Sequence, residues 1–191
     1  MNQEIMDKTA FRKNRSERFV ESLIVRMQDD KAFAAKLRRA DNSATEYQSW
    51  EILASFNINL EKPWERLPYA LIAAALAKAK IEKNGESGLG QALAHCYDDD
   101  SQKGSDSDAA KIKLRRLLSC ESIEELCQIL RPTLSLILSK QKSSRDLNFA
   151  SLLEDLLNFY GETQRQRIKA KWAQNFYQTQ NCNLQKKEVV E

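Results

Sequence analysis

Two short segments of the sequence carry clustered basic side chains at a spacing that suits contact with a polyanion. In the first, residues 111–118 (K-I-K-L-R-R-L-L), three leucines fall on one helical face and the basic side chains occupy the rest of the circumference. The basic residues of this segment are Lys111, Lys113, Arg115 and Arg116. A helix anchored by leucines holds these charges at fixed positions, where they can contact the phosphates of a nucleic acid.

The second segment, residues 33–40 (F-A-A-K-L-R-R-A), repeats this design. Phe33, Leu37 and Ala40 share one face, while Arg38 and Arg39 point away from it. Neither segment contains a glutamate that would neutralise its cations locally. Exposed basic residues often do no more than keep a protein soluble. The basic residues of these segments could therefore bind nucleic acid or only contribute to solubility.

Catalytic chemistry has little support in this sequence. A single histidine, His95, is present, and the motifs of phosphate, acyl and metal chemistry are absent. Adjacent carboxylates such as Glu124 and Glu125, or Glu154 and Asp155, lie on polar helical faces and lack the spacing of a metal-dependent nuclease. We therefore expect no enzymatic activity and no cofactor.

The cysteines and the acidic residues do not indicate a metal site either. No C-x-x-C pair occurs among the four cysteines, which are Cys96, Cys120, Cys127 and Cys182. We expect them to be buried free thiols in a reducing compartment. The aspartates of residues 98–108 lack the order of a calcium-binding loop. Without an apolar N-terminal leader or a stretch long enough to span a membrane, the sequence predicts a cytoplasmic protein with no membrane contact.

Composition predicts an all-α fold. The 191 residues include only 5 glycines and 3 prolines, and 42% of them are apolar. The net charge of +3 is uneven, because residues 98–108 hold five aspartates against one lysine and leave an excess of +7 elsewhere. We interpret this segment as an exposed acidic linker that buries nothing. It would join an N-terminal helical lobe (1–97) to a C-terminal lobe (109–191) with a frayed polar tail.

The periodicity of apolar residues predicts the individual helices. The first lobe should contain helices over 18–27, 33–40, 46–56 and 69–83, the last of these opened by Pro68, and then a helix capped by Ser87. In the second lobe we expect helices over 109–119, from a capping box at 122–125 to a stop or kink at Pro132, over 134–140, over 147–160 and from Thr163 onward.

The order of several motifs resembles a known family. The chain contains L-R-R-A at 37–40, G-L-G-Q-A-L-A at 88–94, the basic helix at 111–118, and L-L-E-D-L-L-N-F-Y-G at 152–161 followed by Arg165 and Trp172. Over residues 18–178 this order is similar to CasB, the small subunit of the type I-E CRISPR surveillance complex Cascade. The acidic segment and Phe159-Tyr160, where several relatives carry tryptophan, depart from the pattern.

The resemblance implies a helical subunit of two lobes without enzymatic activity, which forms a head-to-tail dimer within Cascade. Its partners would be other Cascade subunits, CRISPR RNA, and the target and non-target DNA strands of the R-loop, which it would steady through backbone contacts. The residues implied first are Arg38, Arg39, Arg115, Arg116 and Arg131. Further candidates are Lys78, Lys80, Lys111, Lys113 and Arg165. The alternative is a helical protein-interaction module that docks on an acidic protein partner.

Overall fold

A computed structural model describes residues 14–99, 102–140 and 147–178 of the chain. Within these ranges the regular secondary structure is helical, and the only extended pairing is an isolated bridge between Ser87 and Leu147. The predicted all-α class is confirmed. Cys182 and the predicted frayed tail lie outside the described residues.

The helices follow one another in two runs along the chain. The first run consists of α1 (Arg15–Asp29), α2 (Lys31–Leu37), η1 (Glu46–Ser49), α3 (Trp50–Ser55), α4 (Pro63–Ala79) and α5 (Leu89–His95). The second run consists of η2 (Gly104–Asp106), α6 (Asp108–Ser119), α7 (Ile123–Ser139), α9 (Phe149–Leu157) and α10 (Glu162–Gln178). The prefix η marks a short 3-10 helix.

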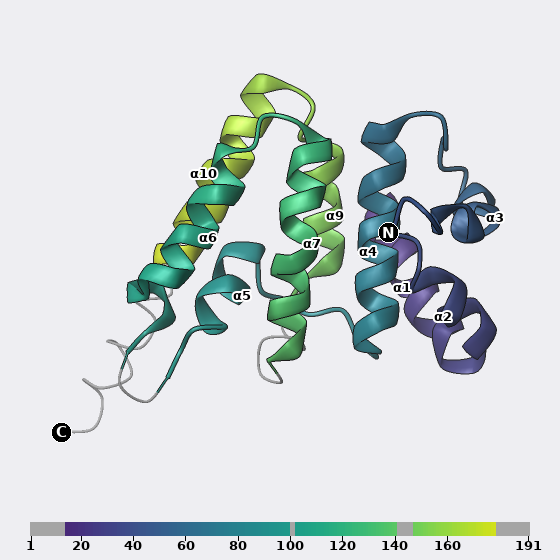
Figure 1. The fold of residues 1–191 in the computed structure, drawn as a ribbon, viewed down its shortest axis with the longest axis horizontal. Helices are drawn as coiled ribbons and strands as arrows, with labels where there is room; N and C mark the ends of the chain where they lie inside the picture. Colours follow the sequence, from purple (N-terminus) through teal and green to yellow (C-terminus); the bar gives the residue numbers. More distant parts are fainter. Residues whose placement is uncertain (1–13, 100–101, 141–146, 179–191) are drawn as a thin grey trace, which may run out of the picture.

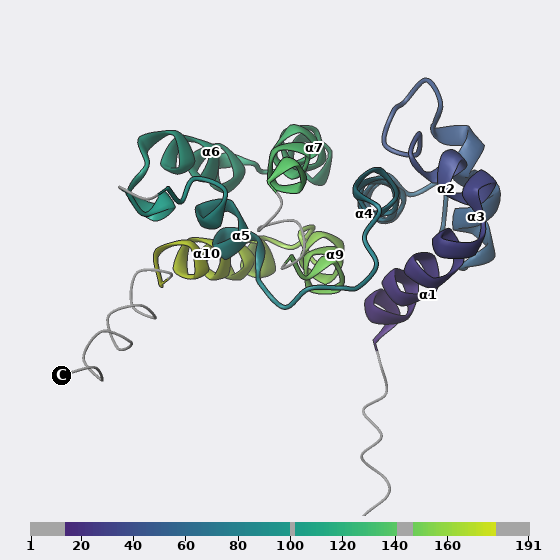
Figure 2. The same cartoon turned by 90° about the horizontal axis from the view of Figure 1, so that it is seen from below.

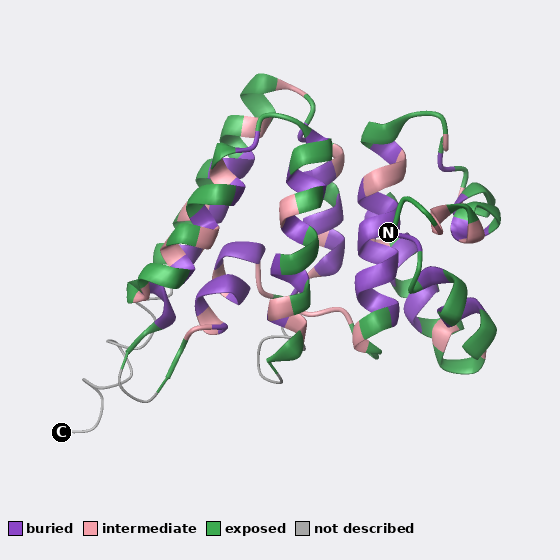
Figure 3. Cartoon of the chain, in the orientation of Figure 1, coloured by how far each residue is buried: buried purple, intermediate pink, exposed green. Residues whose placement is uncertain are grey.

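The order of the helices along the long axis of the molecule differs from their order in the chain (Figures 1 and 2). Helices α1 to α3 lie at one end and α4 lies beside them; α7 and α9 occupy the middle, and α5, α6 and α10 form the other end (Figures 1 and 2). α4 packs on α7 and α9, and α5 packs on α10. Ten consecutive residues of α4, from Pro68 to Ala77, are buried, which leaves this helix with almost no solvent face in its middle (Figure 3).

Short polar side chains fix where several helices begin. Asn14 Oδ1 accepts a hydrogen bond from the backbone N–H of Glu17 at 2.8 Å, and Asp30 Oδ1 accepts one from Phe33 N at 2.8 Å. Ser122 Oγ accepts from Glu125 N at 3.1 Å, so the predicted start of α7 is confirmed. Each cap satisfies a backbone donor that the first helical turn would otherwise leave without a partner.

Two prolines behave differently from the expectation. α4 begins at Pro63 and contains Pro68, so the predicted helix start at Pro68 is wrong. α7 continues through Pro132 to Ser139, so of the stop or kink expected at Pro132 the stop is wrong. In α7 the buried face continues past the proline through Leu134 and Ile137, which pack in the core. This burial outweighs the lost backbone hydrogen bond, which costs about 3 kcal/mol in an exposed helix.

The beginning of α5 is set by a contact with a distant segment. Gly88 is the N-cap residue in place of the predicted Ser87, because the backbone of Ser87 pairs with the segment before α9. Asn148 N donates to Ser87 O at 2.8 Å, and Gly85 N donates to Leu147 O at 3.1 Å. This pairing ties the connection after α4 to the start of α9.

The acidic segment is partly packed against the rest of the protein. Gly104 and Ser105 are buried, against the expectation that nothing in this segment is, and Gly104 N donates to Asp98 Oδ1 at 2.6 Å. Buried side chains from both sides of the segment belong to one hydrophobic cluster. The division into lobes at 98–108 stays a prediction, and any such lobes share a buried contact.

Candidate nucleic-acid interface

The end of α2 places two arginines at the surface. Leu37 and Ala40 are fully buried, whereas Arg38 and Arg39 are exposed, as their helical spacing predicted. Arg38 Nε donates to the carbonyl oxygen of Ala77 at 3.3 Å, and Arg39 Nη1 donates to Gln48 Oε1 at 2.9 Å. Both partners are neutral, so the charges of the two guanidinium groups are not cancelled by these bonds.

Four of the predicted cations line one open pocket, which has a volume of about 380 Å³. They are Arg38 and Arg39 after α2, Lys78 near the end of α4, and Arg131 in α7. These residues are up to 93 positions apart in sequence, and the packing of α4 on α2 and α7 brings them together. We refer to this place as the four-cation pocket.

One buried carboxylate organises the four-cation pocket. The Asp41 side chain is only 7% exposed, and both of its oxygens accept from Lys78 Nζ, at 2.8 and 2.6 Å. Arg131 Nε lies 3.5 Å from Asp41 Oδ2. Asp41 is the only acidic residue in the pocket lining, which leaves an excess of positive charge facing solvent.

Asp41 was not among the residues that the sequence pointed to. It follows L-R-R-A directly and begins the polar turn D-N-S, residues 41–43, which from sequence alone reads as an ordinary loop. A carboxylate directly after a buried apolar residue was the available indication. Its partners Lys78 and Arg131 could not be named, because they lie on other helices.

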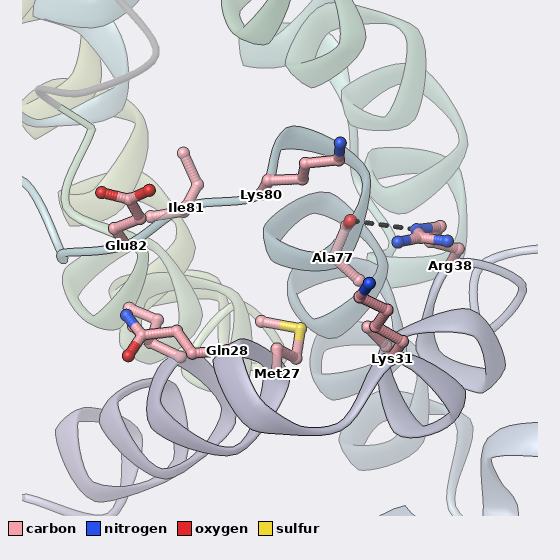
Figure 4. A pocket seen from close by; sticks show the side chains of 10 residues that line it. Met27, Gln28, Lys31, Arg38, Ala77, Lys80, Ile81 and Glu82 are labelled. Atoms are coloured by element: carbon pink, nitrogen blue, oxygen red, sulfur yellow. Dashed lines mark hydrogen bonds between the residues drawn. The ribbon is translucent and has the colours of Figure 1, made fainter.

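Lys80 lies in a neighbouring pocket, which Arg38 also lines (Figure 4). The residue ends α4 in a left-handed conformation, with φ of 52° and ψ of 48°. This conformation stops the helix and turns the chain away from α4. We refer to this place, which has a volume of about 470 Å³, as the Lys80 pocket.

The basic face of α6 forms a separate surface. Leu114 and Leu117 are buried, and Arg115 and Arg116 are exposed and make no ion pair among the described residues. Lys113 is half-buried, and Lys111 Nζ donates to the backbone oxygen of Asp106 at 2.9 Å. α6 lies at the end of the molecule opposite to α2 (Figures 1 and 2), so the fold does not join these residues to the four-cation pocket.

Arg165 takes part in an internal contact. Its side chain is 16% exposed, and its Nη2 lies 3.0 Å from Glu121 Oε2. Lys169, also on α10, lies with its Nζ 2.6 Å from Glu121 Oε1. The hydrogen bond from Lys169 and the nearby Arg165 charge lower the pKa of Glu121 below its ordinary value. These contacts hold α10 to the turn between α6 and α7, and contact of Arg165 with nucleic acid stays a prediction.

The cysteines that the structure describes are buried. They are Cys96, Cys120 and Cys127, and none of the three is part of a disulfide bond. Burial raises the pKa of Cys120 to about 11 and that of Cys127 to about 12, so both are protonated at neutral pH. In the described parts of the chain, no group of three His, Cys, Asp or Glu side chains could hold a metal ion. No helix there is long and apolar enough to cross a membrane.

Comparison with models of protein families identifies the family of this sequence. The family model for CRISPR-associated protein Cse2 matches residues 34–177. The chain belongs to the Cse2 family. The match includes the four-cation pocket, the basic face of α6 and most of α10. The resemblance to CasB, another name for Cse2, is thereby confirmed.

Three solved CasB structures share the fold. The M. ruber CasB structure superposes with a TM-score of 0.63 at 25% identity, covering 93% of this chain and 98% of that one. CasB from Thermus thermophilus gives 0.61 at 23% identity, with 85% and 97% covered. CasB from Thermobifida fusca gives 0.61 at 17% identity, with 85% and 98% covered. No curated protein sequence matches the chain significantly.

Membership of the Cse2 family gives the biological setting. The family provides a structural subunit of the Cascade complex in CRISPR defence, and the other Cascade subunits are accordingly partners of this chain.

Proposed function

We propose that this Cse2 protein is a non-catalytic subunit that binds the backbones of CRISPR RNA and DNA and stabilises the R-loop. The observation that carries the proposal is the four-cation pocket, which Arg38, Arg39, Lys78 and Arg131 line together, with Lys78 and Arg131 paired to Asp41. Cations fixed on three separately packed segments form a rigid site for phosphates. Membership of the Cse2 family supports the proposal, because Cascade, the complex in which the family serves, works with RNA and DNA strands.

The side chains of the four-cation pocket suit contact with the phosphate backbone of a nucleic acid and do not require recognition of its bases. Arginine forks match phosphate oxygens in pairs, and Arg38 and Arg39 are bonded only to neutral oxygens. In an R-loop the guide RNA reads the sequence, and the exchange of base pairs is nearly balanced in free energy. A few phosphate contacts are therefore enough to favour the open state.

The basic face of α6 provides a second contact under this proposal. Arg115 and Arg116 lie at the end of the molecule opposite to α2. In a head-to-tail dimer, the α6 end of one copy would lie next to the α2 end of the other. The four-cation pocket and the basic face of α6 would then alternate along the dimer. A long nucleic-acid strand could contact both surfaces of both copies.

A salt titration of nucleic-acid binding tests the proposal. We expect the logarithm of the affinity of the full chain for single-stranded DNA to fall linearly with the logarithm of the salt concentration. The double variant Arg38→Glu, Arg39→Glu should reduce the slope by about 1 for each phosphate that it no longer binds. The matched control is Arg18→Glu with Arg167→Glu, which makes the same charge change at exposed positions on α1 and α10. The control should bind more tightly than the pocket variant.

The same titration examines α6 and the alternative function. The variant Arg115→Glu, Arg116→Glu should keep its helicity, because the buried leucines are untouched, and should also bind DNA more weakly. Cascade reconstituted with either double variant should form fewer R-loops on a target duplex than Cascade with the parent. Binding that does not depend on salt, or an equal decrease in affinity in pocket and control variants, would overturn the proposal in favour of a protein-interaction module.

A further inference from the structure

The Lys80 pocket has the size of a ligand site. Its volume of about 470 Å³ falls in the range of roughly 300–1,000 Å³ that is usual for sites of small ligands. It lies between α1, α2 and the end of α4, and it borders the four-cation pocket at Arg38. Because the two pockets share Arg38, one nucleic-acid strand can occupy both at once.

The lining of the Lys80 pocket is divided by chemistry. The cations Lys31, Arg38 and Lys80 lie on one side, and Gln28 and Glu82 lie on the other (Figure 4). The apolar lining consists of Ile24, Met27, Ala34, Ala77 and Ile81. This order of positive charge, apolar surface and hydrogen-bonding groups corresponds to the order of phosphate and base in a nucleotide.

The cations of this pocket are available to an anion. Neither Lys31 nor Lys80 forms an ion pair among the described residues, and Arg38 donates only to a backbone carbonyl. Glu82 is exposed, so it contacts water in the free protein and can accept a hydrogen bond from a ligand. The pocket holds three cations against this one carboxylate.

We propose that the Lys80 pocket takes one unpaired nucleotide of a strand whose backbone lies in the four-cation pocket. Lys31, Arg38 and Lys80 bind its phosphate, and the base lies on Met27 and Ile81. The base edge then faces Gln28 and Glu82. Because Glu82 accepts hydrogen bonds, it favours a base with an exocyclic amino group, such as cytosine, over thymine. This inference rests on the proposed function and narrows it to single-stranded nucleic acid, because a duplex must first unstack a base.

Two probes with equal charge separate base binding from phosphate binding. We would measure binding of the full chain to a labelled ten-nucleotide oligodeoxycytidine and to an abasic strand with the same number of phosphates. The parent should bind the cytidine strand about threefold to tenfold more tightly, as expected for the net effect of one hydrogen bond of typical strength. Purely electrostatic binding would give equal affinities.

The variant Gln28→Ala with Glu82→Ala gives the decisive comparison. It removes a negative charge, so electrostatics alone predicts tighter binding of both probes. The nucleotide site predicts the opposite for the cytidine strand, whose advantage over the abasic strand should disappear. The matched control is Glu162→Ala with Gln174→Ala, which changes two exposed residues of α10 and should keep that advantage.

Photocrosslinking locates the base independently of affinity. A 5-iodocytosine in the middle of the strand should crosslink to the peptide that contains Met27 and Gln28. Equal affinities for the two probes with a normal salt dependence, or crosslinks confined to α6, would overturn this inference and leave the proposed function intact. A parent protein that binds neither probe would overturn both.

Discussion

At the scale of single residues, two carboxylates determine what the nearby cations can do. Asp41 is almost fully buried and holds Lys78 and Arg131 at one wall of the four-cation pocket. It therefore has two opposing effects: it fixes the positions of the two cations, and it cancels part of their charge. Glu121 has a similar place at the other end of the molecule, between Arg165 and Lys169.

We predict that Asp41→Asn lowers the free energy of unfolding by about 1–3 kcal/mol, the usual effect of breaking hydrogen bonds to a charged group. The same change should strengthen binding to single-stranded DNA at low salt, because it raises the positive charge of the pocket. Urea unfolding and a binding titration measure the two effects. Weaker binding by a variant that is still folded would show that the alignment of Lys78 and Arg131 matters more than their net charge.

For Glu121 we predict a decrease of stability in acid. Its pKa is lowered in the folded protein, chiefly by the hydrogen bond from Lys169, so the carboxylate stabilises the fold above its ordinary pKa of 4.5. This contribution disappears as the pH falls through the lowered value. The thermal midpoints of the parent and Glu121→Gln should differ at pH 7 and converge in acid, whereas Glu162→Gln should match the parent throughout. A difference that persists at the lowest pH would contradict this explanation.

At the scale of elements, the contact between α5 and α10 depends on a glycine. A Cβ atom at Gly90 would overlap the carbonyl oxygen of Trp172 and crowd the backbone nitrogen of Phe176. The two helices therefore approach each other closely only because residue 90 has no side chain. Their contact also positions Trp172, whose Nε1 donates to Asp155 Oδ2 at 2.8 Å.

We predict that Gly90→Ala destabilises the protein by about 1–3 kcal/mol or more, since the overlapping atoms belong to the backbone and cannot rotate away. Gly161→Ala is the matched control, because nothing lies within 4 Å of the added methyl group. That control should leave the unfolding midpoint unchanged or raise it slightly. Chemical denaturation followed by circular dichroism compares the two variants, and equal midpoints would show that α10 can shift away from α5.

At the scale of the whole molecule, α4 joins the α1–α3 end to the middle helices. It contacts α1, α2 and α3 on one side and α7 and α9 on the other. Cations from α2, α4 and α7 form a pocket because these helices share one core. Residues before and after the acidic segment belong to this same core.

We therefore predict a single cooperative unfolding transition. In a Trp50→Phe, Trp64→Phe variant, Trp172 is the only tryptophan, and its fluorescence reports on the α5, α6 and α10 end. Its midpoint should coincide with the midpoint of circular dichroism at 222 nm, which reports on every helix. Two separate midpoints would mean that the ends unfold independently and would favour lobes that meet near residues 98–108.

The sequence by itself determined the features that depend on neighbours along the chain. Apolar periodicity predicted the all-α class and the exposed arginine pairs 38–39 and 115–116, and S-x-x-E predicted the start of α7. The order of motifs identified the family. Each of these properties is set within a few residues, by helix geometry or by a local hydrogen bond.

Only the tertiary structure decided which of those residues meet. Burial extends α4 and α7 across Pro68 and Pro132, although local rules predicted a helix start at Pro68 and a stop or kink at Pro132. Packing of α2, α4 and α7 brought four of the ten candidate cations into one pocket with Asp41. Packing at the other end placed Arg165 in an internal ion pair and left the basic face of α6 apart. These outcomes depend on contacts between residues distant in sequence, and such contacts leave no periodic pattern in the chain that forms them.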